Sequence, residues 1–217
     1  MDKRAIIEKI TKVVRQKLDG EGSGHDWWHV YRVWKMAMRI GKEEGADIFV
    51  VELAALLHDI ADWKFYGGDD TVGPRVARQI LSEHDVPEDV VARVCEIISA
   101  MSFKGAGVRD NVLTLEGKVV QDADRLDAIG AIGIARTFAY GGHAGREIYN
   151  PEQKPVVHQT KEEYIKGGGH TINHFYEKLL LLKDRMNTQA ARQLAEDRHR
   201  FMEEYLDRFF EEWEGEM

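Results

Sequence analysis

The stretch VVELAALLHDIA, residues 50–61, decides the fold. Apolar side chains occupy nearly every side of a helix with this sequence, and Asp47 stands where it can cap the start of that helix. A helix that is apolar all round is buried among other helices. We therefore expect this segment to be the central helix of an all-α domain.

Apolar residues recur at helical spacing on both sides of this segment. The pattern predicts helices over residues 2–18, 27–39, 74–83, 87–101, 115–128, 171–185 and 188–213, with another after Gly130. Residues 141–170 hold six glycines, two prolines and three histidines, which favours a long surface loop. No internal repeat or strand pattern is evident, so we predict one all-α domain over residues 1–217.

The composition excludes several classes of protein. Apolar residues make up 43% of the 217, enough for a core, and no stretch approaches the roughly 20 apolar residues that span a bilayer. The start lacks the apolar run of a signal peptide, so we expect a cytoplasmic protein with no membrane partner. Cys95 is the single cysteine, which rules out an intrachain disulfide and a cysteine-rich zinc site. The net charge of -8 argues against general nucleic-acid binding, but not against a small phosphorylated substrate.

The pair His58-Asp59, at the end of the buried segment, is the strongest local signal for chemistry. Burying a carboxylate costs free energy unless it is paired or bound to a cation, and the imidazole beside it suggests that both face one ion. The alternative is that the helix ends here and exposes both side chains. Two further His-Asp pairs lie in polar surroundings, where Asp26 and Asp85 are expected to cap the helices that follow.

A metal site needs further ligands, and two segments offer them. His29 lies in the first turn of the helix expected from residue 27. The segment VVQDADRLDAIG, residues 119–130, carries three aspartates beside inward apolar side chains. Asp124 is either a ligand or a solvated residue on the flank of this helix. Asp122 is expected to be a surface charge, and Asp127 an acceptor that supports the ligands.

The order of these pieces resembles the H…HD…D signature of the HD superfamily: His29, then LLHDIAD with His58-Asp59, then DADRLDAIGAIGIAR with Asp124. The resemblance runs from about residue 25 to residue 210 and is close to a bacterial branch of small metal-dependent phosphohydrolases. The segments HFYEKLL and MNTQAAR look like the C-terminal segment of that branch. It implies an HD-domain helical bundle with one central divalent metal, held by His29, His58, Asp59 and Asp124.

Two imidazoles and two carboxylates suit a hard or borderline divalent ion and leave about two of six octahedral positions open. Manganese and magnesium are favoured, while iron, nickel, cobalt and zinc are chemically allowed. Between the HD pair and Asp124 the sequence offers a single histidine, His84, in an expected turn. A second metal is therefore not expected.

Other polar residues near the signature are candidates for catalysis and for substrate binding. Asp62 is the candidate base that deprotonates the attacking water, and the resemblance supports Lys64 as a phosphate-binding residue. The alternatives are a surface acid and a solvated lysine. Arg32 and Arg146 are candidate substrate-binding residues; the alternatives are a salt bridge for Arg32 and a solvated loop for Arg146. Support for the last metal ligand is expected from Arg125 and Asp127.

The predicted reaction is the hydrolysis of a phosphoric ester or anhydride. The resemblance implies a nucleotide substrate and favours a nucleoside triphosphate pyrophosphohydrolase, which releases a monophosphate and pyrophosphate from an NTP or dNTP. A nucleoside monophosphate phosphatase and a non-catalytic nucleotide-sensing domain are the alternatives. A di-iron bundle needs paired Glu-x-x-His motifs, and the chain has one, at Glu196 and His199. Monomer and homodimer both remain open.

Overall fold

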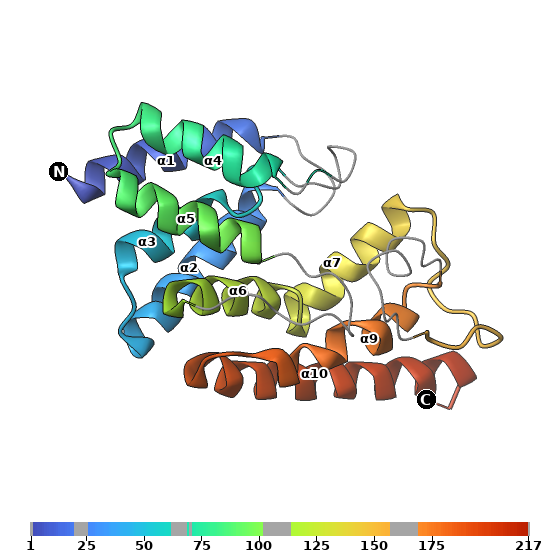
Figure 1. Cartoon of the computed structure of the whole chain (residues 1–217). Coiled ribbons are helices and arrows are strands. Elements are labelled where there is room, and N and C mark those ends of the chain that lie inside the picture. The colour runs from blue at the N-terminus through green and yellow to red at the C-terminus, as the bar shows by residue number, and fades with distance from the viewer. Residues whose placement is uncertain are drawn as a thin grey trace. The chain divides into compact units, whose positions relative to one another are not determined.

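The structure, a computed structural model, describes residues 2–19, 26–61, 69, 71–101, 114–156 and 169–216. All regular structure in these residues is helical, as the sequence predicts (Figure 1). The α-helices are α1 (Lys3–Lys17), α2 (Trp27–Glu44), α3 (Ile48–Leu57), α4 (Val72–Glu83), α5 (Glu88–Ala100), α6 (Leu115–Asp127), α7 (Gly130–His143), α9 (Asn173–Glu177) and α10 (Gln189–Glu214). Two short 3-10 helices precede α10, η2 (Leu179–Leu181) and η3 (Lys183–Arg185). No described helix is both long and apolar enough to cross a membrane.

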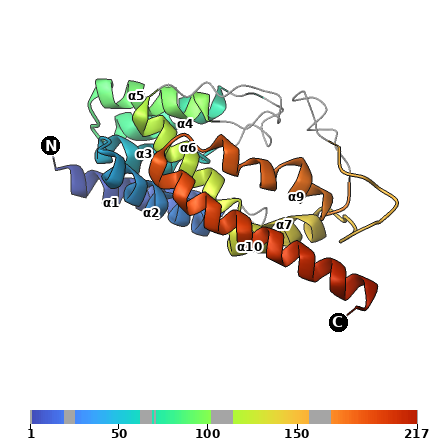
Figure 2. The same ribbon diagram turned by 90° about the horizontal axis from the view of Figure 1, so that it is seen from below.

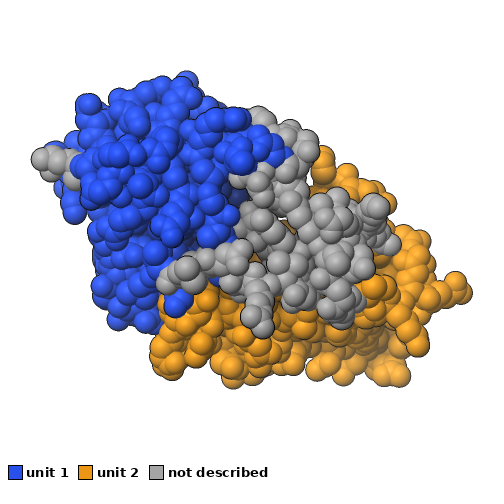
Figure 3. Space-filling view, in the orientation of Figure 1, with its two compact units in different colours: residues 1–103, 109–124 blue, residues 104–108, 125–217 orange. Residues whose placement is uncertain are grey.

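The chain forms two compact units, which Figure 3 distinguishes by colour. Unit 1 comprises residues 1–103 and 109–124, and unit 2 comprises residues 104–108 and 125–217. The division falls inside α6, so most of this helix belongs to unit 1 and its last residues to unit 2. The interpretation of residues 1–217 as a single domain stays a prediction. The helix α7 extends to His143, three residues into the segment predicted as a long loop.

Helix α3 is the core of unit 1. Its side chains from Leu53 to Leu57 are fully buried, as are those of Val50 and Val51. Helices α1, α2 and α5 pack around it, so its sides meet apolar surface as the sequence predicts. Burying a leucine or valine side chain stabilises a fold by roughly 1.5–3 kcal/mol. The packing of α3 therefore holds in place the residues that follow it, His58 and Asp59.

Aspartates begin three helices of unit 1. In α1, α2 and α3 the residue before the helix accepts a hydrogen bond from a backbone N–H of the first turn; these residues are Asp2, Asp26 and Asp47. Such caps satisfy amide groups that have no partner inside the helix. The cap expected at Asp85 is wrong. Helix α5 begins after Pro87, which offers no side-chain acceptor, and Asp85 adopts a φ of 55° in the preceding turn.

Helix α2 is longer than the sequence predicts. Gly41, which lies beyond the helix predicted over residues 27–39, is part of α2, because the missing side chain lets Ile48, Val51 and Val119 approach closely. A Cβ at this position would lie 3.2 Å from the Ile48 side chain. The helix ends at Gly45, whose φ of 74° is a left-handed conformation that glycine adopts at little cost.

Unit 2 is built on α10, which can be followed along its whole length in Figure 2. Helix α7 and η3 pack on it. The rings of Phe138, Phe175 and Tyr205 meet with centroids 6.0 to 6.1 Å apart, and thereby join α7, α9 and α10. A second aromatic cluster gathers around Tyr149 and packs the segment after α7 against the end of α10.

The single helix predicted over residues 171–185 is wrong, because this segment is broken into α9, η2 and η3. Lys178 leaves the helical region with φ -144° and ψ -57°. The turns after it close with hydrogen bonds from residue i to residue i−3, as in a 3-10 helix. These tighter turns bury Leu179, Leu182 and Met186, so they satisfy the apolar spacing that a continuous helix would also explain.

His174 makes unit 2 sensitive to acid. Desolvation lowers the pKa of the His174 ring to about 3, and the charges of Lys178 and Arg146 act in the same direction. A histidine in the unfolded chain has a pKa of about 6.5. As the pH falls below that value, the unfolded state takes up a proton that the folded state does not. The neutral His174 ring therefore costs the folded state no stability above about pH 6.5. Below that value the free energy of unfolding declines as the pH falls towards 3.

We expect His174→Gln to remove this decline. Between about pH 7.5 and about pH 5.5, the wild type should lose about 1.4 kcal/mol more free energy of unfolding than the variant does. Urea denaturation of both proteins at both pH values measures the difference. His143→Gln, at the exposed end of α7, is the control and should keep the wild-type pH dependence. Equal declines in the wild type and in His174→Gln would contradict the prediction.

Candidate metal centre

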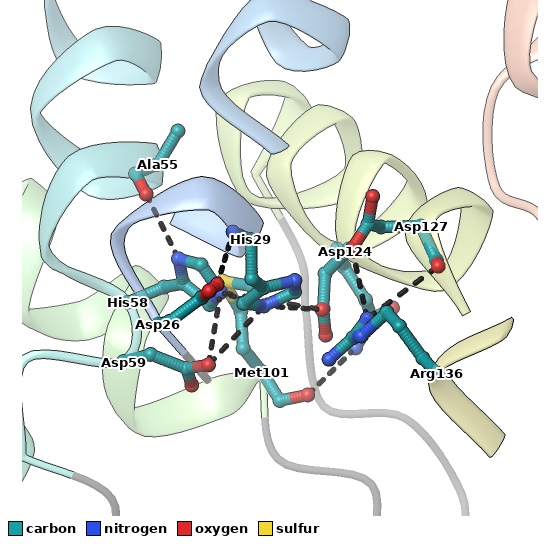
Figure 4. A network of polar contacts seen from close by, with 10 residues as sticks. Asp26, His29, Ala55, His58, Asp59, Met101, Asp124, Asp127 and Arg136 are labelled. Atoms are coloured by element: carbon teal, nitrogen blue, oxygen red, sulfur yellow. Dashed lines mark hydrogen bonds and ion pairs between the residues drawn. The ribbon is translucent and has the colours of Figure 1, made fainter. Parts of the chain in front are cut away.

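Side chains from three helices of unit 1 point toward one another (Figure 4): His29 from α2, His58 and Asp59 from the end of α3, and Asp124 from α6. His29 Nε2 lies 3.2 Å from His58 Nε2, 3.2 Å from Asp59 Oδ2 and 3.5 Å from Asp124 Oδ1. His58 Nε2 lies 3.5 Å from Asp59 Oδ2 and 4.0 Å from Asp124 Oδ1. The structure thus brings together the four residues predicted as metal ligands.

The helix cap at Asp26 sets the position of His29. The carboxylate of Asp26 accepts a hydrogen bond from the His29 backbone N–H at 2.9 Å, which makes His29 the third residue of α2. Its side chain is fully buried, and its ring centroid lies 5.2 Å from that of His58. An imidazole enclosed in this way at a capped helix start has little freedom to turn away.

The last turn of α3 orients His58. The ring atom Nδ1 lies 2.8 Å from the carbonyl oxygen of Ala55. Because a carbonyl can only accept, Nδ1 carries the proton, and Nε2 of the neutral ring then has a free lone pair. Asp59 follows in a turn that closes with a hydrogen bond from the Ile60 N–H to the Leu57 carbonyl. Both side chains are therefore held at the end of the buried helix.

Exposure differs across the cluster. The side chains of His29 and His58 are 0% and 4% exposed, whereas those of Asp59 and Asp124 are 17% and 39% exposed. The imidazoles form the floor of the site, and the carboxylates lie nearer to solvent. The two carboxylates are therefore the part of the cluster that solvent reaches most.

This donor set fits a divalent metal ion. His29, His58 and Asp59 each offer one ligand atom, and these atoms lie within 4.8 Å of one another; Asp124 adds a second carboxylate. Ligands about 2.1 Å from an octahedral ion are about 3.0 Å apart when adjacent and about 4.2 Å apart when opposite. The separations of 3.2 to 4.0 Å lie within that range. The two carboxylates also supply the negative charge that balances such an ion.

Asp122 is not the surface charge that the sequence suggests, because the residue is fully buried. It lies two positions before Asp124, and residues at that spacing occupy different faces of a helix. Its neighbour Gln121 is buried too and donates a hydrogen bond to the Met101 carbonyl at 3.5 Å. These polar side chains of α6 belong to the interior of unit 1 and contribute to its folding.

The last turn of α6 holds Arg125 and Asp127, which belong to unit 2. Arg125 donates a hydrogen bond to the Arg185 carbonyl at 2.5 Å, and the Asp127 carboxylate accepts one from Arg136 at 2.8 Å. Sequence reasoning missed Arg136 because no local pattern links it to an aspartate nine positions earlier. Support of the metal ligands by Arg125 and Asp127 stays a prediction.

The predicted substrate-binding residues are spread over the chain. Arg32 is partly buried on α2 of unit 1. Arg146 belongs to unit 2, and its guanidinium lies over the Tyr140 ring, 5.5 Å from the centroid. Asp62 and Lys64 lie outside the described residues. The roles assigned to these four residues stay predictions.

Comparisons with known proteins agree with this geometry. A family model described as "HD domain" matches residues 27–129, which include all four clustered residues. The Bacillus subtilis protein YpgQ is 45% identical over 202 residues, which cover 92% of this chain and 89% of YpgQ. The crystal structure of YpgQ in complex with ADP has a TM-score of 0.76 at 40% identity, over 96% of this chain and 98% of that one. A Bacillus thuringiensis structure described as an HD-superfamily hydrolase has a TM-score of 0.77 at 45% identity, over 98% and 99% of the two chains.

We expect Asp124→Asn and Asp122→Asn to fail in different ways. Asp124→Asn should raise the Kd for manganese by more than about tenfold, since a neutral amide replaces a charged ligand. The metal-free protein should keep its melting temperature, because this side chain is partly exposed. Asp122→Asn should instead destabilise the metal-free protein by about 1–3 kcal/mol, since the partners of a buried carboxylate are disturbed. Titration calorimetry and thermal denaturation measure the two effects.

His58→Ala is the reference variant for this comparison, because it removes a ligand from the centre of the cluster. It should abolish measurable binding at the site while the far-UV circular dichroism spectrum remains helical. A manganese affinity that falls as far in Asp122→Asn as in Asp124→Asn would show that Asp124 has no special role.

Proposed function

This chain belongs to the HD domain family and is a metal-dependent phosphohydrolase, and we propose that it hydrolyses nucleoside triphosphates to a nucleoside monophosphate and pyrophosphate. The observation that carries the proposal is the cluster of two imidazoles and two carboxylates, whose carboxylates lie nearest to solvent. The complex of YpgQ with ADP supports a nucleotide as the substrate, because that relative covers nearly the whole chain.

We assign His29, His58, Asp59 and Asp124 as the ligands of a single divalent ion, with manganese or magnesium preferred. The fixed tautomer of His58 presents Nε2 to the site, and the two carboxylates supply hard oxygen donors. When bound, such an ion polarises a phosphoryl oxygen and lowers the pKa of water. The buried imidazoles also keep bulk water away from the floor of the site.

In the proposed reaction the oxygen of a water molecule forms a bond to the α-phosphorus. The bond between the α-phosphorus and the oxygen that bridges it to the β-phosphorus breaks, and its electron pair leaves with pyrophosphate. Asp62 accepts the proton of the attacking water. Lys64 offsets the negative charge of the phosphates, and Arg32 and Arg146 are the further candidates for binding them.

Removal of phosphate from a nucleoside monophosphate needs the same residues and differs in the phosphorus that is attacked. The ADP complex of YpgQ favours a substrate with more than one phosphate, because ADP carries a diphosphate. The products of the reaction therefore decide between the two activities.

We expect turnover of nucleoside triphosphates in manganese or magnesium to give equal amounts of monophosphate and pyrophosphate. In ¹⁸O-labelled water the label should enter the monophosphate, because water attacks the α-phosphorus. Anion-exchange chromatography and mass spectrometry of the products measure both quantities. His58→Ala, the control, should release neither product. Orthophosphate released from a monophosphate would support the phosphatase, and nucleotide binding without turnover would contradict the proposal.

Asp62→Asn and Lys64→Ala should impair different steps. Asp62→Asn should keep its affinity for metal and substrate but lose about 10²–10⁴ in kcat, because the attacking water loses its base. Lys64→Ala should raise KM as well as lower kcat, since a phosphate contact acts in the ground state and in the transition state. Steady-state kinetics at saturating manganese separates the two. Wild-type kcat in Asp62→Asn would identify Asp62 as a surface acid.

A further inference from the structure

Arg93 of α5 joins the starts of two other helices of unit 1. Its Nη1 donates a hydrogen bond to Asp47 Oδ2 at 3.0 Å, and its Nη2 lies 3.3 Å from Glu116 Oε1. The same Glu116 oxygen accepts a hydrogen bond from the Asp47 backbone N–H at 3.1 Å. Asp47 caps α3, and Glu116 lies in the first turn of α6. We call Arg93, Asp47 and Glu116 the clamp.

The members of the clamp are partly shielded from solvent. The side chain of Glu116 is 15% exposed, and those of Arg93 and Asp47 are 39% and 38% exposed. Desolvation raises the pKa of Asp47, but the hydrogen bond and charge of Arg93 outweigh it, together with hydrogen bonds from the backbone of Val50 and Phe49, so this pKa is lowered. The Asp47 carboxylate therefore stays ionised and binds Arg93 and the start of α3 at the same time.

The two helices that meet at the clamp meet again at the metal centre. Along α3 the rise from its N-cap Asp47 to its C-cap His58 is about 16 Å, and along α6 the rise from Glu116 to Asp124 is about 12 Å. His58 Nε2 and Asp124 Oδ1 are 4.0 Å apart. The starts of the two helices are therefore joined at the clamp, and their later residues bring His58 and Asp124 together at the metal centre.

A shift of either helix along its axis would move its ligand by the same distance. Metal sites tolerate errors of about 0.2 Å in the distances to their ligands. Apolar packing between helices resists separation more than sliding, whereas the directed bonds of a guanidinium fix the register. The clamp holds that register at the end of α3 and α6 away from the ligands.

We propose that Arg93 is a positioning residue for the metal centre: it fixes the register of α3 against α6, and thereby places Asp124 against His58 and Asp59. This inference rests on the proposed metal site. It requires that loss of the clamp weakens metal binding, although Arg93 itself touches no ligand of the metal.

The test measures the Kd for manganese of the metal-free protein by titration calorimetry, with the melting temperature of each variant recorded. Arg93→Met keeps the apolar stem and removes both bonds, and it should raise the Kd about tenfold. Glu116→Gln keeps an acceptor for the Asp47 N–H and removes one ion pair, so its effect should be smaller. Arg93→Lys keeps the charge but not the two-pronged contact, and it should restore part of the affinity.

Arg78→Met is the matched control. Arg78 of α4 pairs with Glu88 of α5, so this change also breaks an ion pair between helices of unit 1. Neither α4 nor α5 carries a predicted ligand, and the Kd of Arg78→Met should equal that of the wild type. Melting temperatures that fall in both variants with the Kd unchanged in both would reduce Arg93 to a stabilising residue and overturn the inference.

Failure of the metal site itself is distinguishable from failure of the clamp. If the wild type and His58→Ala bind manganese equally, the metal site is wrong and the inference falls with it. If His58→Ala loses the metal while Arg93→Met retains wild-type affinity, the clamp alone is wrong. Should Arg93→Met not fold, Glu116→Gln and Arg93→Lys give the same comparison with milder changes.

Discussion

The proximity of two imidazole nitrogens to each other and to two carboxylate oxygens, with 3.2 to 4.0 Å from each histidine nitrogen to the other groups, is the constraint on which unit 1 depends. These atoms offer lone pairs or negative charge to one another, and burial removes the water that would otherwise solvate the two imidazoles. A cation makes the arrangement favourable, but the chain must first hold the four groups close together. The hydrogen bond of the His29 backbone to Asp26 and that of the His58 ring to the Ala55 carbonyl serve this need.

Apolar and polar contacts stabilise the arrangement of the helices in different ways. The apolar surface of α3 fixes its distance from its neighbours, and directed polar bonds fix its register. Trp34 of α2 donates to the Glu52 carboxylate of α3 at 3.1 Å. Desolvation raises the pKa of Glu52 in spite of that bond and of the nearby lysines. Arg93 makes the corresponding link from α5 to α3 and α6. Each of these links lies away from the ligands, where a rigid helix can transmit register.

Features that depend on neighbours in sequence could be predicted, and those that depend on distant partners could not. The burial of α3 follows from its composition, and the caps at Asp26 and Asp47 follow from residue type and position. The clamp joins residues 46 and 69 positions apart, and no local pattern marks it. The break of the predicted 171–185 helix at Lys178 is equally hidden, because 3-10 turns and a helix bury nearly the same apolar positions.

The aspartates of α6 show why the site itself could be predicted only in part. Its inward side chains, Val119, Val120, Ala123 and Leu126, form one stripe. At about 100° per residue, Asp122 and Asp124 each lie roughly 100° from the centre of that stripe, on opposite flanks. Helical phase alone therefore cannot say which carboxylate faces the histidines, and the family resemblance made the choice. In the structure one flank of α6 is covered, so Asp122 is 0% exposed, and the other faces His29, so the Asp124 side chain keeps 39% of its exposure. The tertiary contacts of α6 thus decide which aspartate is available to a metal and which is committed to folding.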